Sequence, residues 1–96
     1  MSDVKVVVGR LYTEDVGRDS IVAAVREEYD GFTLYPTVGY WKGIEERSVM
    51  VEVIAPVWEG ITEVRHSMTR IAKAIKVANN QQAVLITYGY VETEEV

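Results

Sequence analysis

Two runs of strand-forming residues follow each other closely in the middle of this chain, and they limit the possible folds more than any other feature. The first run extends from Phe32 to Trp41 and the second from Arg47 to Ala55, with the link Lys42-Gly43-Ile44-Glu45-Glu46 between them. Links of about this length join neighbouring antiparallel strands, and Gly43 supplies the positive φ that such a link usually needs. The segment therefore predicts a β-hairpin.

Alternation within the hairpin predicts which side of a sheet each residue faces. In the second strand Val49, Val51 and Val53 share one face, and the opposite face carries Ser48, Met50, Glu52 and Ile54. Side chains alternate in this way because successive residues of a strand point to opposite sides. In the first strand Pro36 cannot donate a ladder hydrogen bond, so we expect that strand at an edge of the sheet or with a bulge at this position.

The remaining apolar periods predict two more strands and two helices. A β-branched run from Val4 to Thr13 and another run from Ala83 to Val91 are typical of strands. A helical period starts at Asp19. We expect Asp19 or Ser20 to be the N-cap of this helix and Gly31 to end it. A second helix is predicted from Ile61 to Asn79-Asn80 by a stripe of apolar residues at helical spacing: Ile61, Val64, Met68, Ile71, Ala72 and Ile75.

This order of elements is that of the ferredoxin-like fold. Strand, helix, strand, strand, helix, strand predicts an α+β sandwich in which two helices cover one face of a four-stranded antiparallel sheet. With 96 residues the chain is long enough for one core, so we expect a single domain over 1–96 that ends in an acidic, frayed tail, residues 92–96.

The sheet face away from the helices is expected to be apolar enough to need a partner. If Val49, Val51 and Val53 face the helices, Met50 and Ile54 face outward, and by alternation Tyr35 and Trp41 or their neighbours share that side. The last strand also has apolar residues on both faces, with Leu85 on one face and Val84, Ile86, Tyr88 and Tyr90 on the other. Monomers rarely leave so large an apolar patch in water. We therefore expect a homo-oligomer, with a dimer that packs sheet on sheet favoured.

Composition excludes several classes of function. The net charge is −5 and Lys and Arg form no cluster, which disfavours nucleic-acid binding. The chain has no cysteine, so disulfides and thiolate chemistry are excluded. Neither a signal-peptide pattern nor an apolar run of membrane-spanning length is present, and we expect a cytoplasmic protein without membrane contact.

Six residues near the hairpin link are candidates for a ligand site: Tyr40, Trp41, Lys42, Glu46, Ser48 and Glu52. Lys42 with Arg47 could receive an anion, while Glu45, Glu46 and Glu52 could act as acid or base groups or bind a hard metal. The alternative for the link is a charged, solvated turn. The Tyr40-Trp41 pair could stack on a planar ligand, or it could fill the core or an oligomer interface.

Glu52 is the most unusual of these residues, because it lies in the middle of a strand on an apolar face. An unpaired carboxylate there is unfavourable, so Glu52 is expected to pair with Arg10, Lys5 or Arg47, or to lie at a wet pocket.

Three further residues are possible ligand contacts. The single histidine, His66, has only Glu63 and Arg70 as neighbours at helical spacing, and we predict neither a metal site nor a cofactor. The amides of Gln81 and Gln82 could contact a ligand or only form the turn that leads into the last strand.

Several motifs of the chain resemble those of an uncharacterised bacterial and phage family of small α/β domains of unknown function. They are Asp30-Gly31-Phe32-Thr33, Gly39-Tyr40-Trp41, Glu46-Arg47-Ser48 and Gln81-Gln82-Ala83-Val84-Leu85. This resemblance implies an oligomeric ferredoxin-like domain and no established activity. At the level of the fold alone, the chain also resembles the nitrogen-regulatory PII and CutA-like proteins, although it lacks their nucleotide-contact motifs.

Three functional interpretations follow from the sequence. The first is a non-enzymatic oligomeric module, of phage or mobile-element origin, that binds a small ligand or a protein through the Tyr40 to Ser48 region. The second is a small enzyme that uses Glu52 or Glu46 as a general base in a pocket at the oligomer interface. The third is a purely structural assembly subunit.

Overall fold

The computed structural model describes residues 4–15, 17–81 and 83–96 of the chain. In chain order its elements are β1 (Val4–Glu14), α1 (Arg18–Arg26), β2 (Thr33–Trp41), β3 (Ile44–Pro56), the 3-10 helix η1 (Val57–Glu59), α2 (Ile61–Asn79) and β4 (Leu85–Thr93). Apart from η1, which lies in the predicted connection between β3 and α2, this is the predicted order. The chain has the ferredoxin-like α+β fold.

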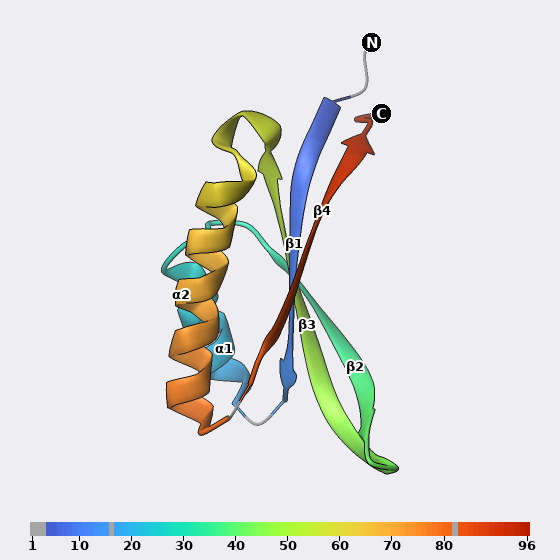
Figure 1. Ribbon diagram of the computed structural model, residues 1–96, viewed down its shortest axis with the longest axis vertical. Coiled ribbons are helices and arrows are strands. Elements are labelled where there is room, and N and C mark those ends of the chain that lie inside the picture. The colour runs from blue at the N-terminus through green and yellow to red at the C-terminus, as the bar shows by residue number, and fades with distance from the viewer. Residues whose placement is uncertain (1–3, 16, 82) are drawn as a thin grey trace.

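The four strands form one antiparallel sheet in the order β2-β3-β1-β4. Both helices lie on the same side of this sheet, and the other side is uncovered (Figure 1). The central positions of β1 and β3 explain their rich content of Val, since each has a neighbouring strand on both sides and the helices above. β2 is an edge strand, as Pro36 predicted, and its pairing with β3 continues without a bulge from Thr33 to Trp41.

The core lies between the helices and the middle of the sheet. Val49, Val51 and Val53 are fully buried, as the alternation predicted, and they are joined there by Leu11 of β1 and by the apolar stripe of α2. The two layers approach closely at Gly9, where an added Cβ would lie 3.3 Å from side-chain atoms of both Met68 and Val53. A glycine at this position therefore lets α2 pack directly on β1.

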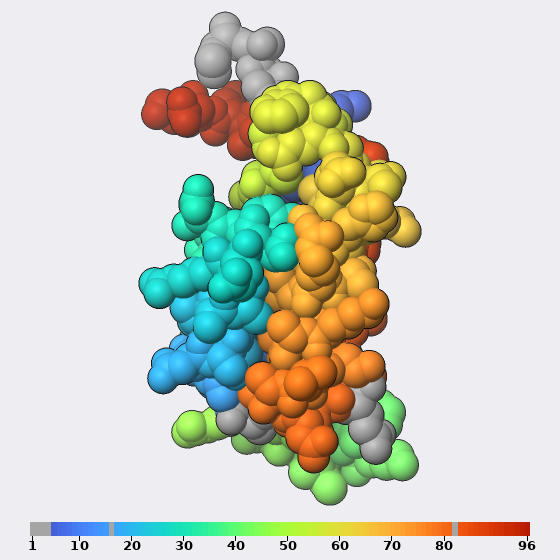
Figure 2. Space-filling view, turned by 90° about the vertical axis from the view of Figure 1, so that its left-hand side faces the viewer, coloured from blue at the N-terminus to red at the C-terminus, as the bar shows by residue number. Residues whose placement is uncertain are grey.

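The predicted five-residue link of the hairpin is wrong, because β3 starts at Ile44 and only Lys42 and Gly43 remain between the strands. Both residues have positive φ, 51° and 79°, which is typical of the tight two-residue turns that match the twist of antiparallel strands. The longer hairpin extends past the end of the helices (Figures 1 and 2). Val38 and Tyr40 are therefore exposed, although they point to the helix side of the sheet.

The predicted ends of α1 are also corrected. Gly17, not Asp19 or Ser20, is the N-cap residue, and the helix ends at Arg26, well before Gly31. The Ser20 hydroxyl lies 2.8 Å from both the Gly17 carbonyl oxygen and the Asn79 side-chain oxygen. Ser20 therefore ties the start of α1 to the end of α2. At the other end of the chain, β4 continues through Glu92 and Thr93, two residues that the sequence pattern placed in the tail.

The burial of Leu11 gives a direct test of the core. Leu11 is fully buried, whereas Leu85 is 64% exposed, so the two leucines form a matched pair. Leu11→Ala should lower the free energy of unfolding by about 3 kcal/mol, because it removes buried apolar surface and leaves a cavity, and Leu85→Ala by less than about 1 kcal/mol. Urea unfolding followed by circular dichroism measures both, and equal losses would contradict this placement of the core.

Candidate functional site

The uncovered side of the sheet, called the open face below, carries large side chains from all four strands. The strand register places Tyr35, Met50, Tyr12 and Leu85 in one row across the sheet. Leu85 is 64% exposed and Ile54, further along β3, is 60% exposed. The predicted outward direction of Met50, Ile54, Tyr35 and Trp41 agrees with this register. An apolar row of this kind is unusual on a surface that faces only water.

An ion pair lies next to this row. Arg10 Nε donates to Glu52 Oε2 at 2.9 Å, and the Tyr35 hydroxyl donates to Glu52 Oε1 at 3.2 Å. The hydrogen bond to Glu52 raises the pKa of Arg10 above its ordinary value. Of the three partners expected for Glu52, the structure selects Arg10. The carboxylate is already engaged by two donors, which makes Glu52 a poor candidate for a free general base.

At the end of the open face nearest the hairpin turn, the surface is hollowed. This concavity, called the acidic hollow below, has a volume of about 570 Å³ and lies between β1, the hairpin and the segment that links α2 to β4. Its described lining residues include aromatic, acidic and amide side chains, with no Lys or Arg among them: Tyr12, Thr13, Glu14, Trp41, Glu46, Ser48, Asn80, Gln81, Ala83 and Leu85. Flat rings beside hydrogen-bonding groups are typical of small-molecule sites.

Two carboxyl groups meet in the acidic hollow. Glu14 lies opposite Ser48 in the sheet, so Glu46, two residues before Ser48, is its diagonal neighbour on the same face. Desolvation raises the pKa of Glu46 above its ordinary value of 4.5, and the negative charge of Glu14 and a hydrogen bond between the two carboxyl groups raise it further. Glu46 therefore keeps its proton to higher pH than an isolated glutamate does.

The side-chain amide of Gln81 also lines the acidic hollow. Thr13 is buried, and its hydroxyl donates to the side-chain oxygen of Gln81 at 2.8 Å. The side-chain nitrogen of Gln81 is buried and has no hydrogen-bond partner among the residues that the structure describes. A buried donor without a partner is unfavourable, and a ligand oxygen or a water molecule could accept from it. Gln82, the other predicted amide, lies outside the described residues.

The structure brings together three of the six predicted site residues. Trp41, Glu46 and Ser48 all line the acidic hollow. Glu52 lies elsewhere on the open face, in its ion pair with Arg10. Lys42 occupies the hairpin turn, with its ammonium group 5.8 Å from the centre of the Trp41 ring.

Tyr40 points to the other side of the sheet, where its hydroxyl donates to Glu45 at 2.7 Å.

Four residues that line the acidic hollow were not predicted as site residues from the sequence: Tyr12, Thr13, Glu14 and Asn80. A usable signal existed for Thr13, which is a polar residue at an inward position of an otherwise apolar strand.

Two other features bear on the classes of site that are possible. In the part of the chain that the structure describes, no group of three or more His, Asp or Glu side chains could hold a metal ion. His66 is exposed on α2. None of the described helices is both long and apolar enough to cross a bilayer.

Comparison with known proteins supports the fold and leaves the family open. No protein-family model matches the sequence, and no curated protein is similar to it. Among solved structures, the chain is similar to the nitrogen regulatory PII-like protein CPII from Thiomonas intermedia K12, solved with ADP, AMP and bicarbonate. The TM-score is 0.64 at 6% identity, with 99% of each chain covered.

Two further structures have the same architecture. A DUF3240 family protein from Shewanella baltica OS155 has a TM-score of 0.59 at 17% identity, over 92% of this chain and 89% of its own. A phage SAM lyase without ligand has a TM-score of 0.63 at 14% identity, over 92% of this chain and 84% of its own. At these identities the likeness concerns the fold, so it confirms the expected structural similarity to PII proteins and does not identify a ligand.

The two carboxyl groups of the acidic hollow predict an unusual pH dependence of stability. Because the pKa of Glu46 is raised in the folded state, that state binds more protons than the unfolded state, and stability falls as pH rises from about 4.5 through the raised value. Glu46→Gln should therefore increase the melting temperature at pH 7 and have no such effect below the ordinary glutamate pKa.

Glu14→Gln provides the reciprocal control for this prediction. It should give a smaller increase at pH 7, because it removes the charge repulsion and leaves the desolvation of Glu46, and the double variant should gain little more than Glu46→Gln alone. Thermal unfolding at several pH values measures these effects. A lower melting temperature for Glu46→Gln at pH 7 would contradict the raised pKa of Glu46.

Proposed function

We propose that this chain is a homo-oligomeric, non-enzymatic module that binds a small molecule in the acidic hollow, and that its open face is the contact between subunits. The observation that carries this proposal is the composition of the acidic hollow. It offers the rings of Trp41 and Tyr12 beside two carboxyl groups, and none of its described lining residues is cationic. Aromatic rings stack on planar ligands, and ring faces and carboxylates both attract cations.

This composition favours a neutral or cationic ligand with a planar ring over a phosphorylated one. A phosphate group in the acidic hollow would lie near Glu14 and Glu46, and Lys42, 5.8 Å from the centre of the Trp41 ring, offsets at most one of these two negative charges. The similar fold of CPII accommodates ADP and AMP, whereas the phage enzyme of similar fold is named for S-adenosylmethionine, which combines a purine with a sulfonium cation. For this chain we favour the second type of compound.

Three adenosine compounds of different charge test the ligand class. S-adenosylmethionine, adenosine and ADP share the same ring, so their order of affinity in calorimetry reports the charge preference of the site. We expect S-adenosylmethionine to bind at least about tenfold more tightly than ADP, with adenosine between them. Tightest binding of ADP would overturn the electrostatic argument.

Variants of the acidic hollow locate the binding. Trp41→Ala should weaken all three compounds by about tenfold, because stacking of a base on an aromatic ring is worth about 1–3 kcal/mol. Trp58→Ala is the matched control, because Trp58 is 80% exposed in η1 and does not line the acidic hollow. Glu46→Gln should reduce the advantage of S-adenosylmethionine over adenosine. Equal effects of the two tryptophan variants would exclude the acidic hollow as the site.

The open face supports the homo-oligomer, with a dimer as the simplest arrangement. Ile54 and Leu85 are mostly exposed, Tyr12 and Tyr35 are partly exposed, and the ion pair of Arg10 with Glu52 satisfies the charges that a covering subunit would bury. At about 25 cal/mol per Å² of apolar surface, a few hundred Å² would favour association by several kcal/mol before the entropic cost.

One charged substitution on the open face tests this contact. Ile54→Glu should shift the protein to monomers in native mass spectrometry, because a buried, unpaired carboxylate is unfavourable at an interface. Val77→Glu serves as control, since Val77 is 85% exposed on α2, away from the sheet, and this variant should keep the oligomer. A monomeric parent protein at micromolar concentration would remove the subunit contact from the proposal.

A second candidate function is an enzyme with Glu46 as its general acid or base. The raised pKa of Glu46 favours this alternative, since catalytic carboxyl groups often have raised pKa values. Product formation from a bound ligand, lost in Glu46→Gln while binding is retained, would support it. A cytoplasmic location and a phage or mobile-element origin stay predictions from the sequence, as does the third alternative, an assembly subunit without ligand.

A further inference from the structure

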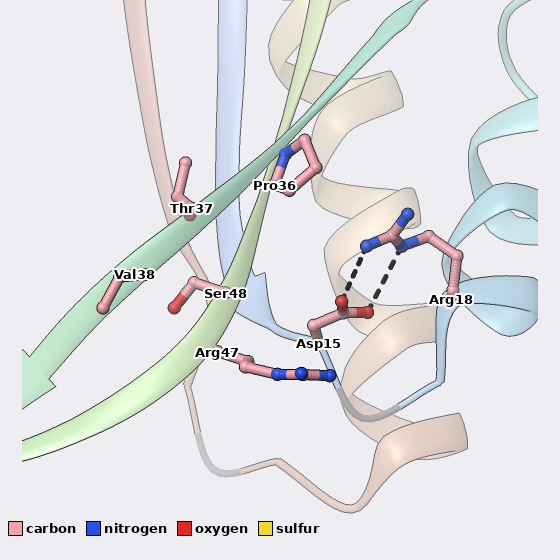
Figure 3. Close-up of a pocket in the computed structure, with 7 residues that line it drawn as sticks. All are labelled: Asp15, Arg18, Pro36, Thr37, Val38, Arg47 and Ser48. Carbon is pink, nitrogen blue, oxygen red and sulfur yellow. Dashed lines mark hydrogen bonds and ion pairs between the residues drawn. The ribbon is translucent and has the colours of Figure 1, made fainter.

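A second hollow, of about 450 Å³, lies beside the edge strand β2. Its lining includes Asp15, Arg18, Val38 and Arg47, and Figure 3 shows these residues in close-up. Val38 and Arg47 are directly opposite each other in the hairpin, on the helix side of the sheet. This second hollow therefore opens on the side away from the acidic hollow, although Ser48 contributes to the lining of both.

Asp15 holds one of the two arginines of this hollow in place. Arg18 donates through Nη2 to Asp15 Oδ2 at 2.7 Å and through Nε to Asp15 Oδ1 at 3.3 Å. This pairing lowers the pKa of Asp15, and the charge of Arg47 lowers it further. These two hydrogen bonds fix the orientation of the Arg18 guanidinium group, and its Nη1 group does not donate to Asp15.

Arg47 is close to the same carboxylate without pairing with it. Within the described residues, Arg47 forms no salt bridge and no side-chain hydrogen bond, and its contact to Asp15 is the backbone bond from Asp15 N–H to the Arg47 carbonyl oxygen at 3.0 Å. Figure 3 shows its guanidinium group beside Asp15, on the same side of the sheet as Arg18. Two guanidinium groups thus face one carboxylate, and one positive charge is left over.

We propose that this hollow binds a small oxyanion, a phosphate or carboxylate group, through the guanidinium group of Arg47 and the Nη1 group of Arg18 that Asp15 leaves free. Guanidinium groups donate two parallel hydrogen bonds to such anions, and Arg47 has all its donors available for them. Val38 and Pro36 supply an apolar wall for the rest of the ligand. The sequence suggested an anion site formed by Arg47 with Lys42, but Lys42 lies over Trp41 at the turn, and Arg18 takes its place.

Titration with inorganic phosphate and, separately, with acetate tests the proposal. At constant ionic strength, amide chemical shifts should change around Asp15, Arg18 and Arg47, and Arg47→Gln should weaken binding by roughly tenfold, as expected for loss of a charged hydrogen-bond donor. Arg26→Gln is the matched control, because Arg26 is an exposed arginine in the last turn of α1. Binding to this control should be unchanged.

The possible outcomes separate the proposal from general charge effects. Binding of phosphate alone points to a phosphate ester, binding of acetate alone points to a carboxylate ligand, and binding of both supports a general oxyanion site. Equal weakening in Arg47→Gln and Arg26→Gln would overturn the proposal, and so would shifts scattered over the surface, since both indicate an adventitious ion only. Arg47 is exposed, so circular dichroism should show an unchanged fold for Arg47→Gln.

Discussion

The packing of α2 on the two central strands is the interaction on which the rest of this structure depends. Met68, Ile71 and Ile75 are buried against the inward valines of β3 and against Leu11. Burial of this apolar surface is the main favourable contribution to folding. The two helices cover the middle of the sheet and end before the tip of the hairpin (Figure 2). The exposed hairpin end then provides both hollows, one on each side of the sheet.

Three ion pairs join acidic and basic side chains among the described residues. Arg10 pairs with Glu52 on the open face, Arg18 with Asp15 in the second hollow, and Arg70 of α2 with Glu28, just after α1. Such exposed pairs contribute little stability individually. Glu46 differs from these three carboxylates, because it lies beside the carboxyl group of Glu14.

The fold was predictable from the sequence because each element has a clear apolar period. The alternation of Val49, Val51 and Val53 predicted the buried side of β3, and the six-residue apolar stripe predicted α2. The turn was not predictable in length, since Lys42 has no sequence signal for a left-handed conformation, although Gly43 does. The acidic hollow was only partly predictable: Trp41, Glu46 and Ser48 are near each other in sequence, whereas Glu14 reaches Glu46 only through the register of β1 with β3.

The acidic hollow is the place where the structure departs from what stability alone would favour. Among the described carboxyl groups with a resolved change, Asp15 and Glu28 have lowered pKa values, and Glu46 alone has a raised one. A raised carboxyl pKa means that ionisation at neutral pH opposes folding. A glutamine at position 46 would have a similar shape and would remove this penalty. Local features that oppose folding concentrate at functional sites, and the raised pKa of Glu46 beside Trp41 agrees with the ligand site proposed for the acidic hollow.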